Sequence, residues 1–188
     1  VEVFTPYTFN ILYEQFINTA FNSNNPELIR STSCLISNIF LHLPKKLAVL
    51  NEMIPEIFEI LIFFLNENEM KDAYPFILEA VSNMFLCNDQ KNETIDQLES
   101  PLYETIMKII DLSKDIDITN ENEVEYDNLF YQYLCDTVRS YAKVFYNSND
   151  ENHEKQQLLL VDRLGCFVCK LSLKISDDLY QAFTLVVK

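Results

Sequence analysis

Two cysteines three positions apart, Cys166 and Cys169 in the stretch GCFVC, have the spacing most suggestive of chemistry. This spacing is typical of zinc sites and of redox-active thiol pairs. A zinc site needs two further ligands, but the two histidines, His42 and His153, lie in other segments without a paired motif. We therefore interpret both cysteines as small apolar residues on a helix, and we predict no metal site.

Adjacent carboxylates at Asp177 and Asp178 could act as general acid and base only in a cleft that separates their pKa values. The surrounding sequence indicates no such cleft, and favours charges at a helix N-terminus that interact with the helix dipole. The chain has a single glycine, Gly165, which argues against a glycine-rich phosphate loop. The sequence thus predicts neither catalytic residues nor a cofactor, and we do not expect an enzyme.

The chain is strongly acidic. It has 188 residues, with 14 Lys and Arg against 29 Asp and Glu, which gives a net charge of −15. Such a charge repels nucleic acids and anionic membranes and attracts basic proteins. The most apolar run, Ile60 to Leu65, is far shorter than the roughly 18–20 residues of a membrane span. We therefore expect protein partners, without direct nucleic-acid binding or membrane insertion.

The cysteines and the N-terminal stretch indicate the redox compartment and the extent of the chain. The five cysteines are odd in number and lie in apolar helical patterns, which favours a reducing compartment. The N-terminal stretch VEVFTPYTF contains no Met, no basic region and no long apolar run, so it does not read as a signal peptide. We expect the sequence to be a piece of a longer protein.

Apolar residues recur at helical spacing between polar breaks along the chain, which predicts an all-α fold. The first predicted helix spans about 7–22, with one apolar face that comprises Phe9, Leu12, Tyr13, Phe16, Ile17, Ala20 and Phe21. The second has Asn25 as N-cap and Pro26 at its first position. Its predicted buried face comprises Leu28, Thr32, Leu35, Ile36, Ile39, Phe40 and Leu43. A third spans about 47–66, where Pro55 should kink or restart it.

The predicted helices pair into about four hairpins within one domain, residues 7–43, 47–87, 101–147 and 155–188. Their second helices begin near Pro26, Lys71 and Glu123, a period of roughly 45–50 residues that is close to that of helical-hairpin repeats. This period predicts an α-solenoid of antiparallel hairpins stacked in sequence order. A compact four-helix bundle is the alternative, but it would leave half of the eight predicted helices unexplained.

The stretch 24–65 resembles a HEAT hairpin. Ile29-Arg30 stands where HEAT repeats have Val-Arg, Cys34-Leu35 follows one turn later, and a Pro-Lys turn at 44–46 leads into LAVLNEMIPEIFEIL. This stretch and DNLFYQYLCDTVRSYAKVFY, residues 127–146, are similar to the exportin and importin-β (karyopherin-β) nuclear transport receptors. The resemblance implies a HEAT/ARM-like α-α superhelix.

The same resemblance implies a function in protein binding. It suggests a segment of a nuclear transport receptor that engages basic cargo, the Ran GTPase or both, and that occurs in cytoplasm and nucleus. The alternative is a HEAT-repeat scaffold in another assembly, such as a chromosome-organising, phosphatase or coat complex. Nucleotide-dependent binding of Ran would distinguish the two, because only a transport receptor should show it.

Arg30 is the residue that this resemblance singles out. Helical spacing places it roughly opposite Leu28, Leu35 and Ile39, so it should point out of its own hairpin. In HEAT-like proteins, such an arginine is expected to reach a carboxylate or carbonyl of the adjacent repeat and to fix the stacking. The alternative for Arg30 is direct contact with a ligand.

The acidic segment 115–127 is the second candidate site. It has six acids and no base, namely Asp115, Asp117, Glu121, Glu123, Glu125 and Asp127. On the functional interpretation, these carboxylates recruit a basic cargo or the basic face of a small GTPase by electrostatic steering. On the other interpretation, the segment is a solvated linker.

Overall fold

The computed structural model describes residues 6–42, 48–86, 93–112, 124–145 and 151–171. These residues are almost entirely helical and include no strand. The elements are α1 (Pro6–Leu12), the π-helical turn η1 (Tyr13–Ile17), α2 (Asn18–Asn22), α3 (Pro26–His42), α4 (Ala48–Leu65), the 3-10 helix η2 (Asn68–Ala73), α5 (Tyr74–Leu86), α6 (Glu93–Asp96), α7 (Glu99–Leu112), α8 (Val124–Phe145) and α9 (Glu151–Leu171). The all-α prediction is therefore confirmed for the described part of the chain.

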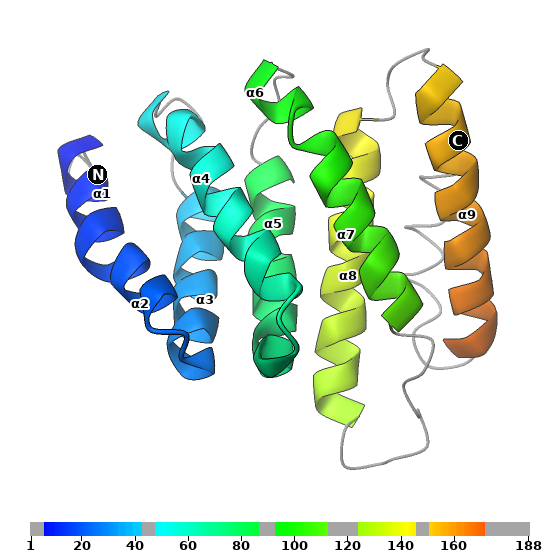
Figure 1. Ribbon diagram of the computed structural model, residues 1–188, viewed down its shortest axis with the longest axis horizontal. Helices are drawn as coiled ribbons and strands as arrows, with labels where there is room; N and C mark the ends of the chain where they lie inside the picture. Colours follow the sequence, from blue (N-terminus) through cyan, green and yellow to red (C-terminus); the bar gives the residue numbers. More distant parts are fainter. Residues whose placement is uncertain (1–5, 43–47, 87–92, 113–123, 146–150, 172–188) are drawn as a thin grey trace.

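The helices form two layers that follow the order of the sequence (Figure 1). In the back layer α3, α5 and α8 run in the same direction, and α5 packs extensively against both of its neighbours. The front layer contains α1–α2, α4, α7 and α9, which run the opposite way. Each back helix packs against the front helix that precedes it, α2 on α3, α4 on α5 and α7 on α8.

A chain of aromatic rings links the two layers and their neighbouring helices. Phe58 of α4 meets Phe85 of α5 edge-on with ring centroids 5.7 Å apart, and Phe85 meets Phe145 of α8 at the same distance. Tyr141 then connects Phe145, at 5.1 Å, with Tyr103 of α7, at 6.1 Å. We refer to these five residues as the aromatic chain. Such edge-to-face and tilted pairs stabilise a core beyond the area that they bury.

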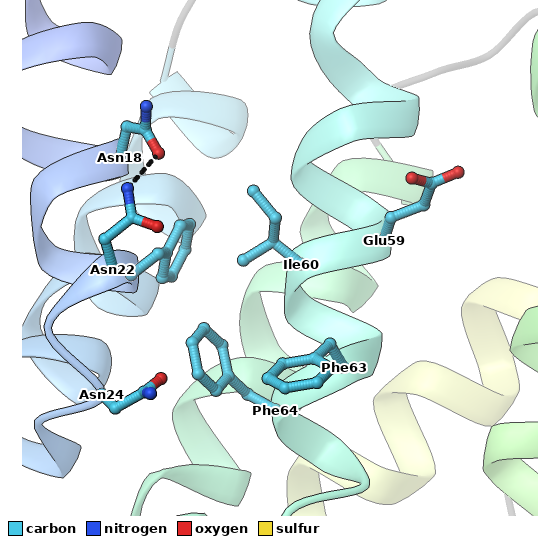
Figure 2. Close-up of a pocket in the computed structure, with 8 residues that line it drawn as sticks. Asn18, Asn22, Asn24, Glu59, Ile60, Phe63 and Phe64 are labelled. Atoms are coloured by element: carbon cyan, nitrogen blue, oxygen red, sulfur yellow. Dashed lines mark hydrogen bonds between the residues drawn. The ribbon is translucent and has the colours of Figure 1, made fainter.

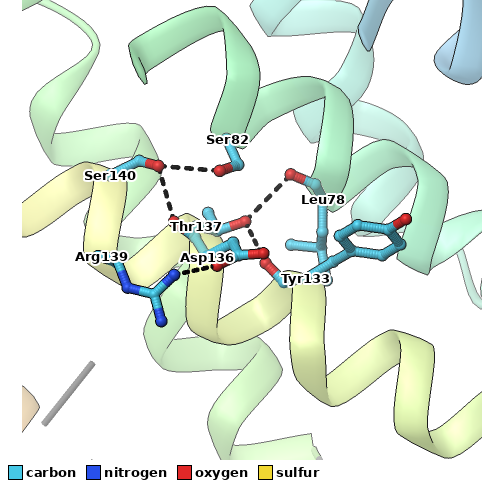
Figure 3. Close-up of polar contacts among 7 residues, drawn as sticks. All are labelled: Leu78, Ser82, Tyr133, Asp136, Thr137, Arg139 and Ser140. Carbon is cyan, nitrogen blue, oxygen red and sulfur yellow. Dashed lines mark hydrogen bonds and ion pairs between the residues drawn. The ribbon is translucent and has the colours of Figure 1, made fainter. Parts of the chain in front are cut away.

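Short polar side chains hold the back layer together. The buried polar residues of this layer are Thr32, Ser33, Ser37, Ser82, Thr137 and Ser140. The hydroxyl oxygens of Ser82 and Ser140 lie 2.8 Å apart, and Thr137 donates to the backbone carbonyl of Leu78 at 3.1 Å (Figure 3). We refer to Ser82, Thr137 and Ser140, together with the backbone carbonyl of Leu78, as the polar seam. Small side chains let two helices approach closely, so the seam sets the spacing of α5 and α8.

Two details of the first helix differ from the prediction. The chain is helical from Pro6 to Asn22, but the turn Tyr13–Ile17 is a π-helix, which the apolar spacing did not indicate. A π-turn holds more residues than an α-turn, so Phe16 rotates away from the face that contains Tyr13 and Ile17. Phe16 is accordingly 61% exposed, while Ile17 is fully buried.

The buried face predicted for the second helix is partly wrong. Ile36, Ile39 and Phe40 of α3 are buried, but Leu28 and Leu35 are 47% and 38% exposed. Ser37 is buried because α5 covers it, and its hydroxyl accepts a hydrogen bond from Asn83 at 2.8 Å. In a helix, Leu28 lies on the side opposite Ser37, away from α5.

Pro55 does not restart the third helix, because α4 continues through it from Ala48 to Leu65. The prediction for the second helix start is confirmed, since the side-chain oxygen of Asn25 accepts hydrogen bonds from the N–H groups of Glu27 and Leu28 at 3.0 and 3.4 Å.

None of the described helices is both long and apolar enough to cross a membrane. The second half of the last predicted hairpin, 172–188, lies outside the described residues.

Candidate functional site

A pocket of about 340 Å³ opens between the first and the second front-layer helices (Figure 2). We refer to it as the α2–α4 pocket. Its lining comes from α2, the turn after it and α4, and comprises Asn18, Phe21, Asn22, Asn24, Glu59, Ile60, Phe63 and Phe64. Polar amides thus face an apolar, aromatic wall, an arrangement that can hold an amphipathic ligand.

The aromatic wall has a fixed base and an exposed edge. Phe21 and Phe64 are buried, and their rings pack against each other across the pocket base with centroids 5.6 Å apart. Phe63 stands beside Phe64, at 5.3 Å and nearly perpendicular to it, but is 54% exposed. Because the buried rings are held by the core, Phe63 presents an apolar surface whose position is largely preset.

The amide wall is ordered by local hydrogen bonds. The side-chain N–H of Asn22 donates to the side-chain oxygen of Asn18 at 2.9 Å, and the Asn22 oxygen is directed toward the α4 wall (Figure 2). Asn24 follows in the left-handed conformation with φ of 50°, which asparagine tolerates better than most residues. A carboxamide has both donors and an acceptor, so this wall can pair with a peptide group.

Arg30 lies on the other layer and contacts the adjacent hairpin. Its guanidinium carbon is 4.4 Å from the centre of the Phe76 ring on α5, a cation–π contact that bridges α3 and α5. The resemblance to HEAT repeats implied a carboxylate or a carbonyl as the partner of Arg30, whereas the structure places an aromatic ring there. The role of Arg30 in stacking stays a prediction, with a smaller expected contribution than a charge-assisted hydrogen bond.

Arg30→Ala should lower the free energy of unfolding by about 0.5–1 kcal/mol, because the contact is exposed, and Tm by about 1–4 °C for a chain of this size. Phe76→Leu should have a similar effect, and the double variant should cost less than the sum of the two. Differential scanning calorimetry on all three variants measures this coupling. Strict additivity, or an unchanged Tm combined with weaker partner binding, would contradict a stacking role.

Cys34, one turn after Arg30, is a partly buried thiol. Burial and the nearby carboxylate of Glu79 raise the pKa of the Cys34 thiol above its usual range. Burial and Glu79 also raise the pKa of Tyr133 on α8. Since a reactive cysteine needs a lowered pKa, Cys34 remains a thiol at neutral pH and is not a candidate nucleophile.

The structure describes only the C-terminal end of the acidic segment. Asp115, Asp117, Glu121 and Glu123 lie outside the described residues, whereas α8 begins at Val124. Glu125 and Asp127 therefore lie at the start of α8, not in a linker as predicted.

Of the histidines, cysteines and aspartates first considered for chemistry, only His42 has a described side chain. His42 is exposed at the end of α3, and Cys166 and Cys169 lie on α9. Among the described residues, no three His, Cys, Asp or Glu side chains come together as a possible metal site. Asp177 and Asp178 lie outside the described residues.

Sequence reasoning missed the α2–α4 pocket. Its signal was present in α4, which is apolar nearly all round, so that Phe63 and Phe64 could not both face the core. Asn18 and Asn22 stood four residues apart on the first helix, a spacing at which side chains meet.

The sequence has no significant match among protein-family models, curated proteins or solved structures.

Proposed function

We propose that this chain is a protein-binding α-solenoid segment of the HEAT type. The observation that supports the proposal is the order of the helices, with α3, α5 and α8 side by side in one layer and α1–α2, α4, α7 and α9 in the other. Repeat proteins bury their apolar faces by stacking neighbouring hairpins in sequence order, which leaves long faces open to partners. The α2–α4 pocket lies on such an open face, between the front-layer helices of two neighbouring hairpins.

We further propose that the segment belongs to a nuclear transport receptor of the exportin or importin-β kind, in cytoplasm and nucleus. Two features support this step, the Ile29-Arg30 pair in the HEAT-like position and the net charge of −15, which favours basic cargo and the basic face of a small GTPase. The HEAT scaffold of a different assembly remains the second candidate for the same fold.

A binding experiment with the Ran GTPase separates the two candidates. The full-length protein is immobilised and incubated with Ran loaded with GTP or with GDP, and bound Ran is quantified. A transport receptor should retain the GTP form at least about tenfold better than the GDP form, which corresponds to about 1.4 kcal/mol. Equal or negligible retention of both forms would favour the scaffold.

Neutralising the acidic segment should slow the association of a basic partner. Asp115, Asp117, Glu121, Glu123, Glu125 and Asp127 are replaced together by Asn or Gln. At about 0.15 M salt the Debye length is roughly 8 Å, so these charges act near the surface and affect mainly the association rate. Stopped-flow experiments should show a several-fold slower association at low salt and a smaller difference at high salt. An identical rate and salt dependence for both versions would mean a solvated spacer.

A further inference from the structure

Both walls of the groove that contains the α2–α4 pocket carry only negative charge. The ranges Pro6–Asn22 and Ala48–Leu65 contain no Lys or Arg, and their carboxylates are Glu14, Glu52, Glu56 and Glu59. All four side chains are exposed. Glu59 lies on the rim of the pocket, with its carboxylate directed away from the asparagines (Figure 2). The charge around the pocket therefore favours cations over anions.

Two of these carboxylates lie next to the pocket, one on each wall. Glu56 precedes Ile60 by four residues, which is about one turn of α4. Glu14 precedes Asn18 by four residues, which is slightly less than one turn of the π-helix η1. Both lie close to Tyr13: burial raises the pKa of Tyr13, and the neighbouring carboxylates of Glu56 and then Glu14 raise it further. An apolar pocket is thus followed by an acidic position about 5 Å along the groove.

We propose that the groove binds a segment of a partner protein that carries a large apolar side chain and, about one helical turn away, a Lys or Arg. The apolar side chain enters the α2–α4 pocket against Phe63 and Ile60, and the cation reaches Glu14 and Glu56. The amides of Asn18 and Asn22 pair with the peptide groups between them. The proposal rests on the protein-binding function above and names the chemistry of the partner.

Other occupants fit the same surface less well. A nucleic acid or a phosphorylated segment would bring negative charge to a groove that has only carboxylates. A second copy of this chain would carry its own net charge of −15 toward it. The volume of about 340 Å³ lies at the small end of the roughly 300–1,000 Å³ of ligand pockets, which suits one side chain with its flanking backbone.

The test uses selection from a display library of random 12-residue peptides against the 188-residue chain, followed by fluorescence polarisation with the selected peptides. We expect peptides that pair Leu, Ile, Phe or Met with Lys or Arg three or four positions away. Phe63→Ala should weaken their binding by roughly tenfold or more, because it removes the exposed anchor surface. Glu14→Gln combined with Glu56→Gln should weaken it several-fold and reduce its salt dependence.

Leu158→Ala is the matched control. Leu158 is 63% exposed on α9, which belongs to neither wall of the groove, so its truncation should leave peptide binding unchanged. Circular dichroism confirms that each variant is folded. The inference would be overturned if the selection enriched no peptides, or enriched peptides that are acidic or lack a large apolar residue. It would also be overturned if the selected peptides bound the Phe63→Ala variant as well as the original chain. The last result would leave the protein-binding function standing, because peptides would still bind elsewhere, whereas the Ran experiment tests the receptor function without using the pocket.

Discussion

Phe85→Ala should lower the free energy of unfolding by about 3–5 kcal/mol, the typical cost of truncating a buried Phe. Phe85 is 1% exposed and lies in the middle of the aromatic chain, between Phe58 of α4 and Phe145 of α8. Its removal therefore leaves a cavity and also deletes two ring contacts, each worth about 0.5–1.5 kcal/mol beyond burial. Urea unfolding followed by circular dichroism measures the change through the midpoint and the slope.

A loss of this size is a large fraction of the stability of a typical domain, which is only about 5–15 kcal/mol. Phe85→Leu keeps most of the volume and should cost less than Phe85→Ala. Phe63→Ala on α4 is the matched control for an exposed ring, since Phe63 is 54% exposed, and it should cost less than about 1 kcal/mol. Equal effects at the two positions would mean that Phe85 does not join α4 to α8.

The sequence was sufficient to predict the existence and approximate ends of the main helices. Apolar spacing acts within one element, and end signals are local: Asn25 caps α3 in the structure because its side chain reaches the N–H groups of the next residues. The start of α8 at Val124 likewise follows a change from polar to periodic sequence near Glu123. These features depend on few residues outside the helix itself.

Which face of each helix is buried could not be predicted as well, because burial depends on the neighbours. Ser37 is buried only since α5 lies against that side of α3, and Leu28 is exposed since it lies on the other side. The π-turn of the first helix is a further case, because it shifts Phe16 out of an apolar face that looked regular in the sequence.

The candidate site shows the same division between local and tertiary information. The outward direction of Arg30 followed from helical spacing, but its partner, Phe76, comes from another helix. The pocket needs α2 and α4 side by side, with Phe21 and Phe64 meeting at its base, and nothing in either helix alone specifies that contact. The acidic residues around the pocket, in contrast, can be identified from the sequence once Pro6–Asn22 and Ala48–Leu65 are known to form its two walls.

Ser140→Leu should lower the free energy of unfolding by about 2–6 kcal/mol. Ser140 is fully buried where α8 meets α5, and its hydroxyl donates to the carbonyl of Asp136 at 2.7 Å. The hydroxyl hydrogen of Ser140 is therefore already engaged with Asp136. In the hydrogen bond between the Ser82 and Ser140 hydroxyls, whose oxygens lie 2.8 Å apart, Ser82 is thus the donor and Ser140 the acceptor (Figure 3). A leucine would force the two helices apart, at a typical cost of about 1–3 kcal/mol, and would remove the acceptor of Ser82, for about 1–3 kcal/mol more.

Ser31→Leu provides the control for the same substitution at an exposed site. The Ser31 hydroxyl also donates to the carbonyl four residues earlier, that of Glu27 at 2.9 Å, but Ser31 faces solvent on α3. Its replacement should therefore change the free energy of unfolding by no more than about 0.5 kcal/mol. The double variant Ser82→Ala with Ser140→Ala should be nearly neutral, because both partners of the bond are removed together. If Ser140→Leu were tolerated as well as Ser31→Leu in urea unfolding, α5 and α8 would not be in close contact at the polar seam, and the back layer would be packed differently.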